Sequence, residues 1–321
     1  MSTILKNSDR RAVRFAPIIG CAFLALFIGS CSIQQLAIDM VADALSGGGG
    51  TGSASAFTGD NDPDLVGDAL PFALKLYEIL LDQSPENEAL HLTTGTAFVM
   101  YANAYVQGPA DMMPDEEFEQ RRFMRERAKK LYIRGRDYIL QGLDLKYPGF
   151  KEAVLAGEGA PYLEAMVQDD VSALYWAGAG WLAAVSINLF DVEIGITRES
   201  AVSLLTRALE IDETYSEGAI HEVLISYYGA LPEMMGGSEQ KARYHFQRVV
   251  EFSGDTKPGP YIALATSVSK KNLDSAEFRQ LLEKALSFEA ADPDTQLITI
   301  ISQRKAQWLL DHISDYFFDV E

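Results

Sequence analysis

The sequence predicts an all-α protein built as an array of helical hairpins. From Asp64 onward, apolar residues recur with helical spacing, and no alternating run rich in Val, Ile or Thr interrupts them. A small-large-small pattern also recurs along this region, which indicates repeated helix packing. With 321 residues, 48% of them hydrophobic, the chain is long enough to bury a core in one domain or two.

Helix boundaries are marked by the expected residues. Pro63 and Pro114 lie near predicted helix starts, Asp274 and Asp294 place negative charge on first turns, and Gly254 follows a predicted end. The predicted helices span residues 64–82, 87–107, 115–146, 149–156, 160–167, 170–190, 197–211, 215–230, 238–253, 258–270, 273–288 and 293–318.

The recurring pattern places a small or apolar residue at i, a large one at i+4 and a small or apolar one at i+7, all on one helix face. The spacing of its copies approaches the 34-residue period of tetratricopeptide repeats, so we predict a degenerate tetratricopeptide-like array. A non-repetitive helical bundle is the alternative, because the proline that follows the repeat survives only as Pro85. The copies are Ala73, Tyr77, Leu80; Ala201, Leu205, Ala208; Ala242, Phe246, Val249; and Phe278, Leu282, Ala285.

The N-terminus has the pattern of a secretory signal, with basic residues before an apolar run at 15–28. That run is shorter than the roughly 20 residues of a membrane-spanning helix. Residues 28–31, Ile-Gly-Ser-Cys, resemble the bacterial lipobox, so we expect a signal peptide at 1–30 and lipidation of Cys31. An uncleaved signal anchor is the alternative. Ser32, where inner-membrane lipoproteins of enteric bacteria carry aspartate, favours the outer membrane.

Residues 31–63 are expected to hold the lipidated cysteine, a short helix at 33–45 and a Gly/Ser-rich tether, ahead of an all-helical domain at 64–321. The chain has 27 Lys and Arg against 46 Asp and Glu, a net charge of −19. Loss of the leader removes four basic residues and Asp9, which changes the net charge to −22. This acidity repels phosphate and excludes nucleic acid as a partner.

Motifs of catalysis or metal binding are not expected. The other cysteine, Cys21, leaves with the leader, so the domain would hold no thiol. His221-Glu222 begins like a zinc-protease helix, but that motif requires histidine where this chain has Ile225. Gly236-Gly237 lies in no phosphate-binding pattern, and we therefore predict no enzyme activity, no cofactor and no metal.

Two stretches are candidates for binding. Small residues between two tryptophans at 173–184, and a polar pair opening an aromatic helix at 221–228, would suit a ligand or partner groove, with core packing as the alternative. The predicted groove residues are Tyr175, Trp176, Trp181, Asn188, His221, Glu222, Tyr227 and Tyr228. A basic run is a candidate docking patch, with a solvated face as the alternative. It comprises Arg121, Arg122, Arg125, Arg127, Lys129 and Lys130.

Most of the mature chain resembles the T component of tripartite ATP-independent periplasmic (TRAP) transporters, the TatT family of lipoproteins. The resemblance implies a tetratricopeptide-like fold, a homo-oligomer with a trimer as its expected form, and association with the periplasmic substrate-binding P component. The resemblance implies no catalytic residues. The blocks that carry it are DPDLVGDALPFALKLYEILLDQSPE from Asp62, AKKLYIRGRDYILQGL from Ala128, ALYWAGAGWLAAVSIN from Ala173, RALEIDETYSEGAIHEVLISYY from Arg207, KARYHFQRVVEFSG from Lys241, EFRQLLEKAL from Glu277 and RKAQWLL from Arg304.

From these observations we predict a lipid-anchored, periplasm-facing accessory protein that binds the P component and the small, partly apolar ligand that it carries. The alternative is a scaffold lipoprotein that uses the same helical repeats for envelope or outer-membrane assembly. In either function the protein binds a partner and catalyses no reaction.

Overall fold

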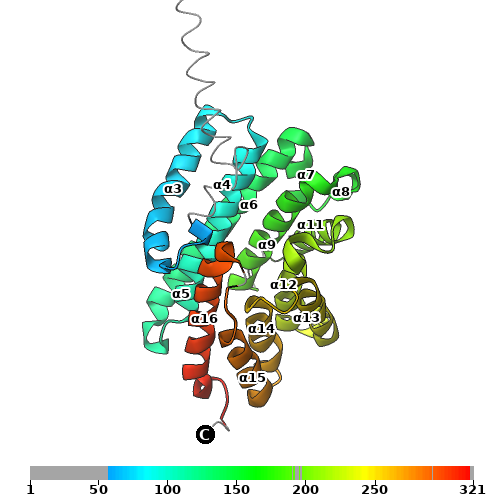
Figure 1. The fold of residues 1–321 in the computed structure, drawn as a ribbon. Coiled ribbons are helices and arrows are strands. Elements are labelled where there is room, and N and C mark those ends of the chain that lie inside the picture. Colours follow the sequence, from blue (N-terminus) through cyan, green and yellow to red (C-terminus); the bar gives the residue numbers. More distant parts are fainter. Residues whose placement is uncertain (1–56, 190, 192–194, 196, 291, 319–321) are drawn as a thin grey trace, which may run out of the picture.

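The computed structural model describes residues 57–318 except 190, 192–194, 196 and 291. Its described residues form helices and connections without a strand, so the all-α prediction is confirmed (Figure 1). The helices, numbered as in Figure 1, are α3 (Pro63–Gln83), α4 (Glu88–Tyr101), α5 (Gly108–Asp111), α6 (Phe118–Lys146), α7 (Phe150–Leu155), α8 (Ala160–Ala165), α9 (Val171–Ile187), α11 (Arg198–Ile211), α12 (Tyr215–Ala230), α13 (Glu239–Ser253), α14 (Gly259–Leu264), α15 (Ser275–Leu286) and α16 (Gln296–Asp311).

The predicted leader, the lipidation site Cys31 and most of the predicted linker lie outside the described residues, and these stay predictions. From residue 63 onward, each predicted helix has a counterpart that begins and ends within a few residues of the expected bounds, apart from the last, which ends at Asp311. In the part of the chain that the structure describes, no helix has the length and apolarity needed to cross a membrane.

Side-chain caps fix several helix starts. The Asp62 carboxylate accepts hydrogen bonds from the backbone N–H groups of Asp64 and Leu65, each at 3.1 Å. Asn87 caps α4, Ser238 caps α13 and Asp274 caps α15 in the same way. Such a cap satisfies a backbone donor that the first turn leaves without a partner, and it contributes about 1 kcal/mol.

The helices pack in consecutive pairs. α4 packs on α6, α9 on α11, α12 on α13 and α14 on α15, while α6 and α9 join the first two pairs. The last three copies of the repeated pattern lie on α11, α13 and α15, the second helices of their hairpins. Eight of their nine side chains are buried, and Phe246 is half-buried. The predicted array of helical hairpins is therefore confirmed, with the pattern on the packing face of each second helix.

The last helix returns to the first one. α16 contacts α3, and the Arg304 guanidinium lies 3.1 Å from the Asp64 carboxylate (Figure 1). Both side chains are exposed, so this ion pair itself contributes little to stability. It shows that the two ends of the array meet.

Glycines allow neighbouring helices to approach closely. A β-carbon at Gly135 of α6 would lie 2.7 Å from the Gly95 carbonyl oxygen of α4 and 2.9 Å from Val99 Cγ2. On α9, a β-carbon at Gly178 would lie 2.7 Å from Leu205 Cγ, and one at Gly180 would lie 2.7 Å from Val99 Cγ2. α4, α6, α9 and α11 are therefore held at distances that a larger residue would not permit.

Two local features differ from the predicted regular helices. α12 begins with Ser216, Glu217 and Gly218 in the left-handed region, at φ values of 47°, 55° and 88°, so its regular part starts after them. Two helices also continue as π-helical segments, Ala102–Gln107 after α4 and Ala265–Ser269 after α14. The spacing of apolar residues in the sequence does not predict either feature.

We expect Gly135→Ala to lower the free energy of unfolding by about 1 to 3 kcal/mol, because the added methyl forces α4 and α6 apart. Urea denaturation followed by circular dichroism measures this change. Glycine to alanine within a helix otherwise raises stability by roughly 0.5 to 1 kcal/mol. An unchanged or higher stability would therefore show that the two helices are not in close contact.

Candidate functional site

The tryptophan-rich stretch forms α9, and its small residues serve helix packing. Gly178 faces α11 and Gly180 faces α4, as their close neighbours show. Trp181 is fully buried, and its indole N–H donates to Thr197 Oγ1 at 3.0 Å. The Arg136 guanidinium lies 4.5 Å from its ring centroid, within range of a cation–π contact. Trp181 thus belongs to the core, which corrects its assignment to an accessible groove.

The other aromatic residues of α9 lie nearer the surface. Tyr175 and Trp176 are half-buried, with ring centroids 5.0 Å apart, and Tyr175 also contacts Tyr215 at 5.3 Å. Burial raises the pKa of Tyr175, and the negative charge of Glu222 on α12 raises it further. Tyr175 therefore lies beside Trp176 and close to Glu222, and the groove that these residues are predicted to line stays a prediction.

Glu222 lies in the contact between α12 and the start of α14. A β-carbon at Gly259 would overlap its carboxylate, so a larger residue there would require the Glu222 side chain to move. Burial raises the pKa of Glu222, while Lys257 opposes that shift. Asn188 is exposed at the C-terminal end of α9. Tyr175, Trp176 and Glu222 are each half-buried, and we call these three the α9–α12 cluster.

His221 and Tyr228 point to α13. His221 Nδ1 lies 2.7 Å from His245 Nδ1, so one ring donates a hydrogen bond to the other. The Tyr228 ring stacks on His245 with an interplanar angle of 1°. His221 is fully buried, whereas Tyr227 is half-buried and touches Tyr228 at a centroid distance of 5.0 Å. His221 and Tyr228 therefore pack the α12–α13 contact, which corrects their assignment to a groove with Glu222.

Burial lowers the pKa of both histidines. For His245 the pKa falls to about 4, with further lowering from His221 and Lys241. For His221, Arg248 adds to the effect of burial, and Glu213, 3.6 Å from Nε2, opposes it. The ring that accepts the shared hydrogen bond must be unprotonated at Nδ1, and the lowered pKa values favour the neutral form of both rings.

The basic run lies along the first half of α6, where nearby acids pair with most of its cations. Arg121 pairs with Asp115 at 2.8 Å, Arg122 with Glu119 at 2.5 Å and Arg125 with Asp111 at 3.4 Å. Lys129 pairs with Asp191, and Arg127 lies over the Tyr101 ring. Lys130 is exposed. These pairs reduce the positive field of the predicted docking patch, which stays a prediction.

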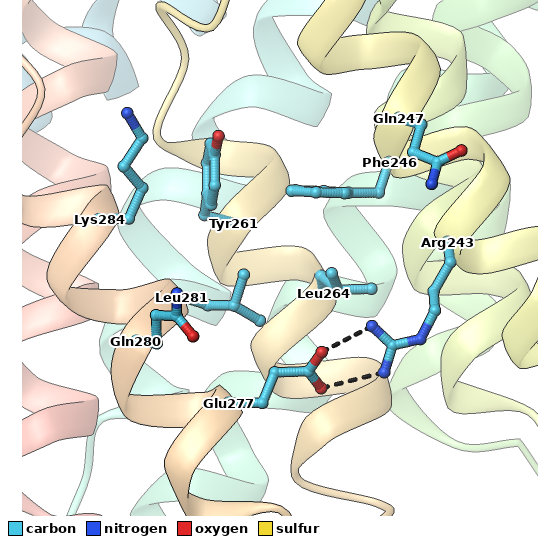
Figure 2. Close-up of a pocket in the computed structure, with 9 residues that line it drawn as sticks. All are labelled: Arg243, Phe246, Gln247, Tyr261, Leu264, Glu277, Gln280, Leu281 and Lys284. Atoms are coloured by element: carbon cyan, nitrogen blue, oxygen red, sulfur yellow. Dashed lines mark hydrogen bonds and ion pairs between the residues drawn. The ribbon is translucent and has the colours of Figure 1, made fainter.

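A recess that the sequence did not indicate lies between α13, α14 and α15, with a volume of about 500 Å³ (Figure 2). Its apolar part is formed by Phe246 and Tyr261, whose rings meet edge-on at 5.1 Å, together with Leu264 and Leu281. Figure 2 shows Gln247 and Gln280 on opposite sides of the recess. Neither amide has a hydrogen-bond partner among the described residues.

The charged residues of the recess are neutralised within the chain. Arg243 donates to Glu277 at 2.6 and 3.1 Å and to Glu239 at 2.8 Å (Figure 2). These bonds lower the pKa of Glu277, chiefly through Arg243, and Ser269 donates to Glu277 as well. Lys284 pairs with Asp255 at 2.9 Å. An occupant would therefore meet an apolar floor and two free amides rather than a net charge.

Comparisons of the sequence with known proteins show the family. The sequence model described as "TRAP transporter T-component" matches residues 59–317, nearly all of the described chain. The chain belongs to the TRAP transporter T-component family. A protein of Treponema pallidum (strain Nichols) is 37% identical to it over 267 residues, covering 82% of this chain and 83% of that protein. That relative bears the name "Uncharacterized protein", so it supports the family without adding a function.

Stability should fall as the solution is acidified below the unfolded pKa of histidine, about 6.5. Because the pKa of His245 in the folded state is about 4, the unfolded state binds more protons than the folded state between about pH 4 and pH 6.5. Stability is therefore complete above pH 6.5, and His245 alone should cost about 2 kcal/mol between pH 7 and pH 5. Urea unfolding across this range measures the loss.

His245→Asn, which keeps a polar atom near the Nδ1 position, should flatten this pH dependence. His312→Asn, directly after α16, is the matched control and should retain the wild-type slope. An equal slope in wild type and His245→Asn would contradict the assignment.

Proposed function

We propose that this protein is the lipid-anchored T component of a TRAP transport system and binds its substrate-binding P component in the periplasm. The observation that carries the proposal is the family match over residues 59–317. Anchoring through Cys31, by preference to the outer membrane, would keep the helical body where a periplasmic protein encounters it. The protein would act as a homo-oligomeric binding partner and not as an enzyme.

The recess between α13 and α15 supports a docking role. Protein interfaces gain most of their affinity from a few large side chains that fill desolvated pockets. Here the apolar floor of Phe246, Tyr261 and Leu281 suits such a side chain. Gln247 and Gln280 can bond to the peptide backbone on either side of it. Because Arg243 and Glu277 neutralise each other, the segment that docks would be uncharged.

The α9–α12 cluster supports a second role in binding the small, partly apolar ligand. Tyr175 and Trp176 offer aromatic surface, and Glu222 supplies one polar group of raised pKa. This combination of apolar walls and a single polar anchor is typical of small-molecule sites. The cluster lies on different helices from the recess, so a variant can test each separately.

A binding assay against the purified P component of the same transport system tests the proposal. Gln280→Trp should weaken the complex at least tenfold, because the indole fills the recess without removing a buried contact. Glu283→Trp, an exposed position on the same helix outside the recess, is the control and should bind as wild type does. Biolayer interferometry gives both dissociation constants.

Equal binding by both variants would place the P component elsewhere on the chain. If the wild-type protein does not bind the P component, the proposed function is wrong. Crosslinking in cells then decides the alternative, since recovery of outer-membrane assembly factors alone would identify a scaffold.

A further inference from the structure

A second recess lies along α16, the last α-helix among the described residues (Figure 1). Its volume is about 490 Å³, and its apolar walls are Leu286 of α15 together with Ile300 and Trp308 of α16. Arg304 and Gln307 line it as well, and both are exposed. We call these five residues the α16 groove.

The walls of the α16 groove are held in place by contacts within the chain. The Gln303 amide donates to the backbone carbonyl oxygens of Leu286 at 3.1 Å and Phe288 at 2.7 Å, which joins the end of α15 to α16. The Trp308 ring stacks on His312 with a centroid distance of 4.3 Å. Leu286 and Trp308 are both half-buried, so part of their apolar surface still faces the groove. The groove is therefore formed before anything binds in it.

The shape of the α16 groove fits one more helix. The residues of α16 that line it are spaced three or four apart from Ile300 to Asp311, so they share one face of the helix. At 1.5 Å per residue, this face is about 17 Å long. In an array of hairpins each helix is covered by the next one, but no α-helix follows α16 in the part of the chain that the structure describes.

The sequence supplies an amphipathic helix of matching length. Residues 33–45, which lie outside the described residues, are predicted to be helical, with Leu36, Met40, Val41 and Leu45 on one side. From its first residue to its last, such a helix would be about 18 Å long. Helices that bind in grooves use apolar residues at this spacing as their anchors.

We propose that residues 33–45 of the same chain bind in the α16 groove as a helix antiparallel to α16. The described chain begins at Phe57, and Asp64 of α3 lies 3.1 Å from Arg304 in the groove. Residues 46–56 have a root-mean-square reach of roughly 5.5 Å × √11, about 18 Å, which is as long as the groove. A short flexible tether gives an effective concentration of about millimolar, so the groove needs only weak affinity.

Charge favours the antiparallel direction. The segment carries Asp39 and Asp43 and no basic residue, whereas the cations of α16 are Arg304 and Lys305. When an antiparallel segment is centred on α16, both aspartates lie within about one helical turn of these cations. A parallel segment would instead bring Asp43 beside Asp311, which would be repulsive.

A lipid surface is a poorer partner for the same segment. Helices that lie on membranes carry Lys or Arg on their polar face, where they meet anionic headgroups. The polar face of residues 33–45 carries two aspartates instead, which such headgroups would repel. The basic pair on α16 therefore suits the segment better than a membrane does.

Docking would determine how the body is held. With the lipid on Cys31, as proposed above, only Ser32 would separate the anchor from the bound helix. The end of α16 near Asp311 would then face the membrane, and the body would not hang from the whole tether. The docking itself requires neither the lipid nor the P component, so it can fail while the proposed function holds.

Disulfide formation in the full-length protein, purified in detergent, tests the bound helix. Under mild oxidation we expect Ala37→Cys to form an intramolecular disulfide with Gln307→Cys at least tenfold faster than Gln35→Cys does. Ala37 lies on the apolar side of the segment and Gln35 on the opposite side. Gln307→Cys alone is the control for Cys21 and Cys31, and peptide mass spectrometry identifies the bond. Equal rates for the two pairs would overturn the proposal, and so would disulfides formed mainly between chains, which would assign the groove to a second copy.

Hydrogen exchange tests the same contact without added cysteines. An isolated helix this short is marginal in water, so its amides exchange slowly only when it is bound. We expect the amides of residues 33–45 to exchange at least tenfold more slowly in the wild type than in Leu36→Asp. Ile38→Asp, on the other side of the segment, is the matched control and should exchange as the wild type does. Equal exchange in the wild type and Leu36→Asp would overturn the proposal. Protection that appears only after the P component is added would also overturn it, because it would assign the segment to that partner.

Discussion

Close contact between small residues on neighbouring helices is the constraint on which the rest of the structure depends. Gly135 of α6 crosses Gly95 of α4, and Gly178 and Gly180 let α9 lie between α11 and α4. Each crossing fixes one helix against the next one, and an array of hairpins is the sum of such nearest-neighbour contacts. The buried side chains of the described residues form several clusters along the array, so these crossings also determine where the surfaces lie.

The array separates the surfaces that could bind partners. The α9–α12 cluster joins first helices of two hairpins, whereas the recess lies where α13 and α15, the second helices of their hairpins, flank α14. One chain can thus present a candidate ligand cluster and a candidate docking recess on different helices. A protein that works by association gains from such separation, since one partner need not displace another.

The helices, and the face that each repeated helix buries, could be predicted from the sequence. Ala201, Leu205 and Ala208 share a helix face wherever that helix lies, so their burial follows from spacing alone. The sequence could not predict which neighbouring helix a given side chain contacts. His221 and Glu222 are adjacent in sequence, yet one packs on α13 and the other on α14. The recess was missed for the same reason, because Arg243 and Glu277 are brought together only when two hairpins stack.

We propose that this family member functions by binding the P component and does not turn over a substrate. Native mass spectrometry of the lipoprotein mixed with that component tests the claim most directly, because it reports partners, copy number and retained ligand in one spectrum. We expect a complex whose mass is the sum of intact subunits, with any small ligand as a non-covalent addition. Separate peaks for the two proteins at concentrations well above physiological levels would contradict it.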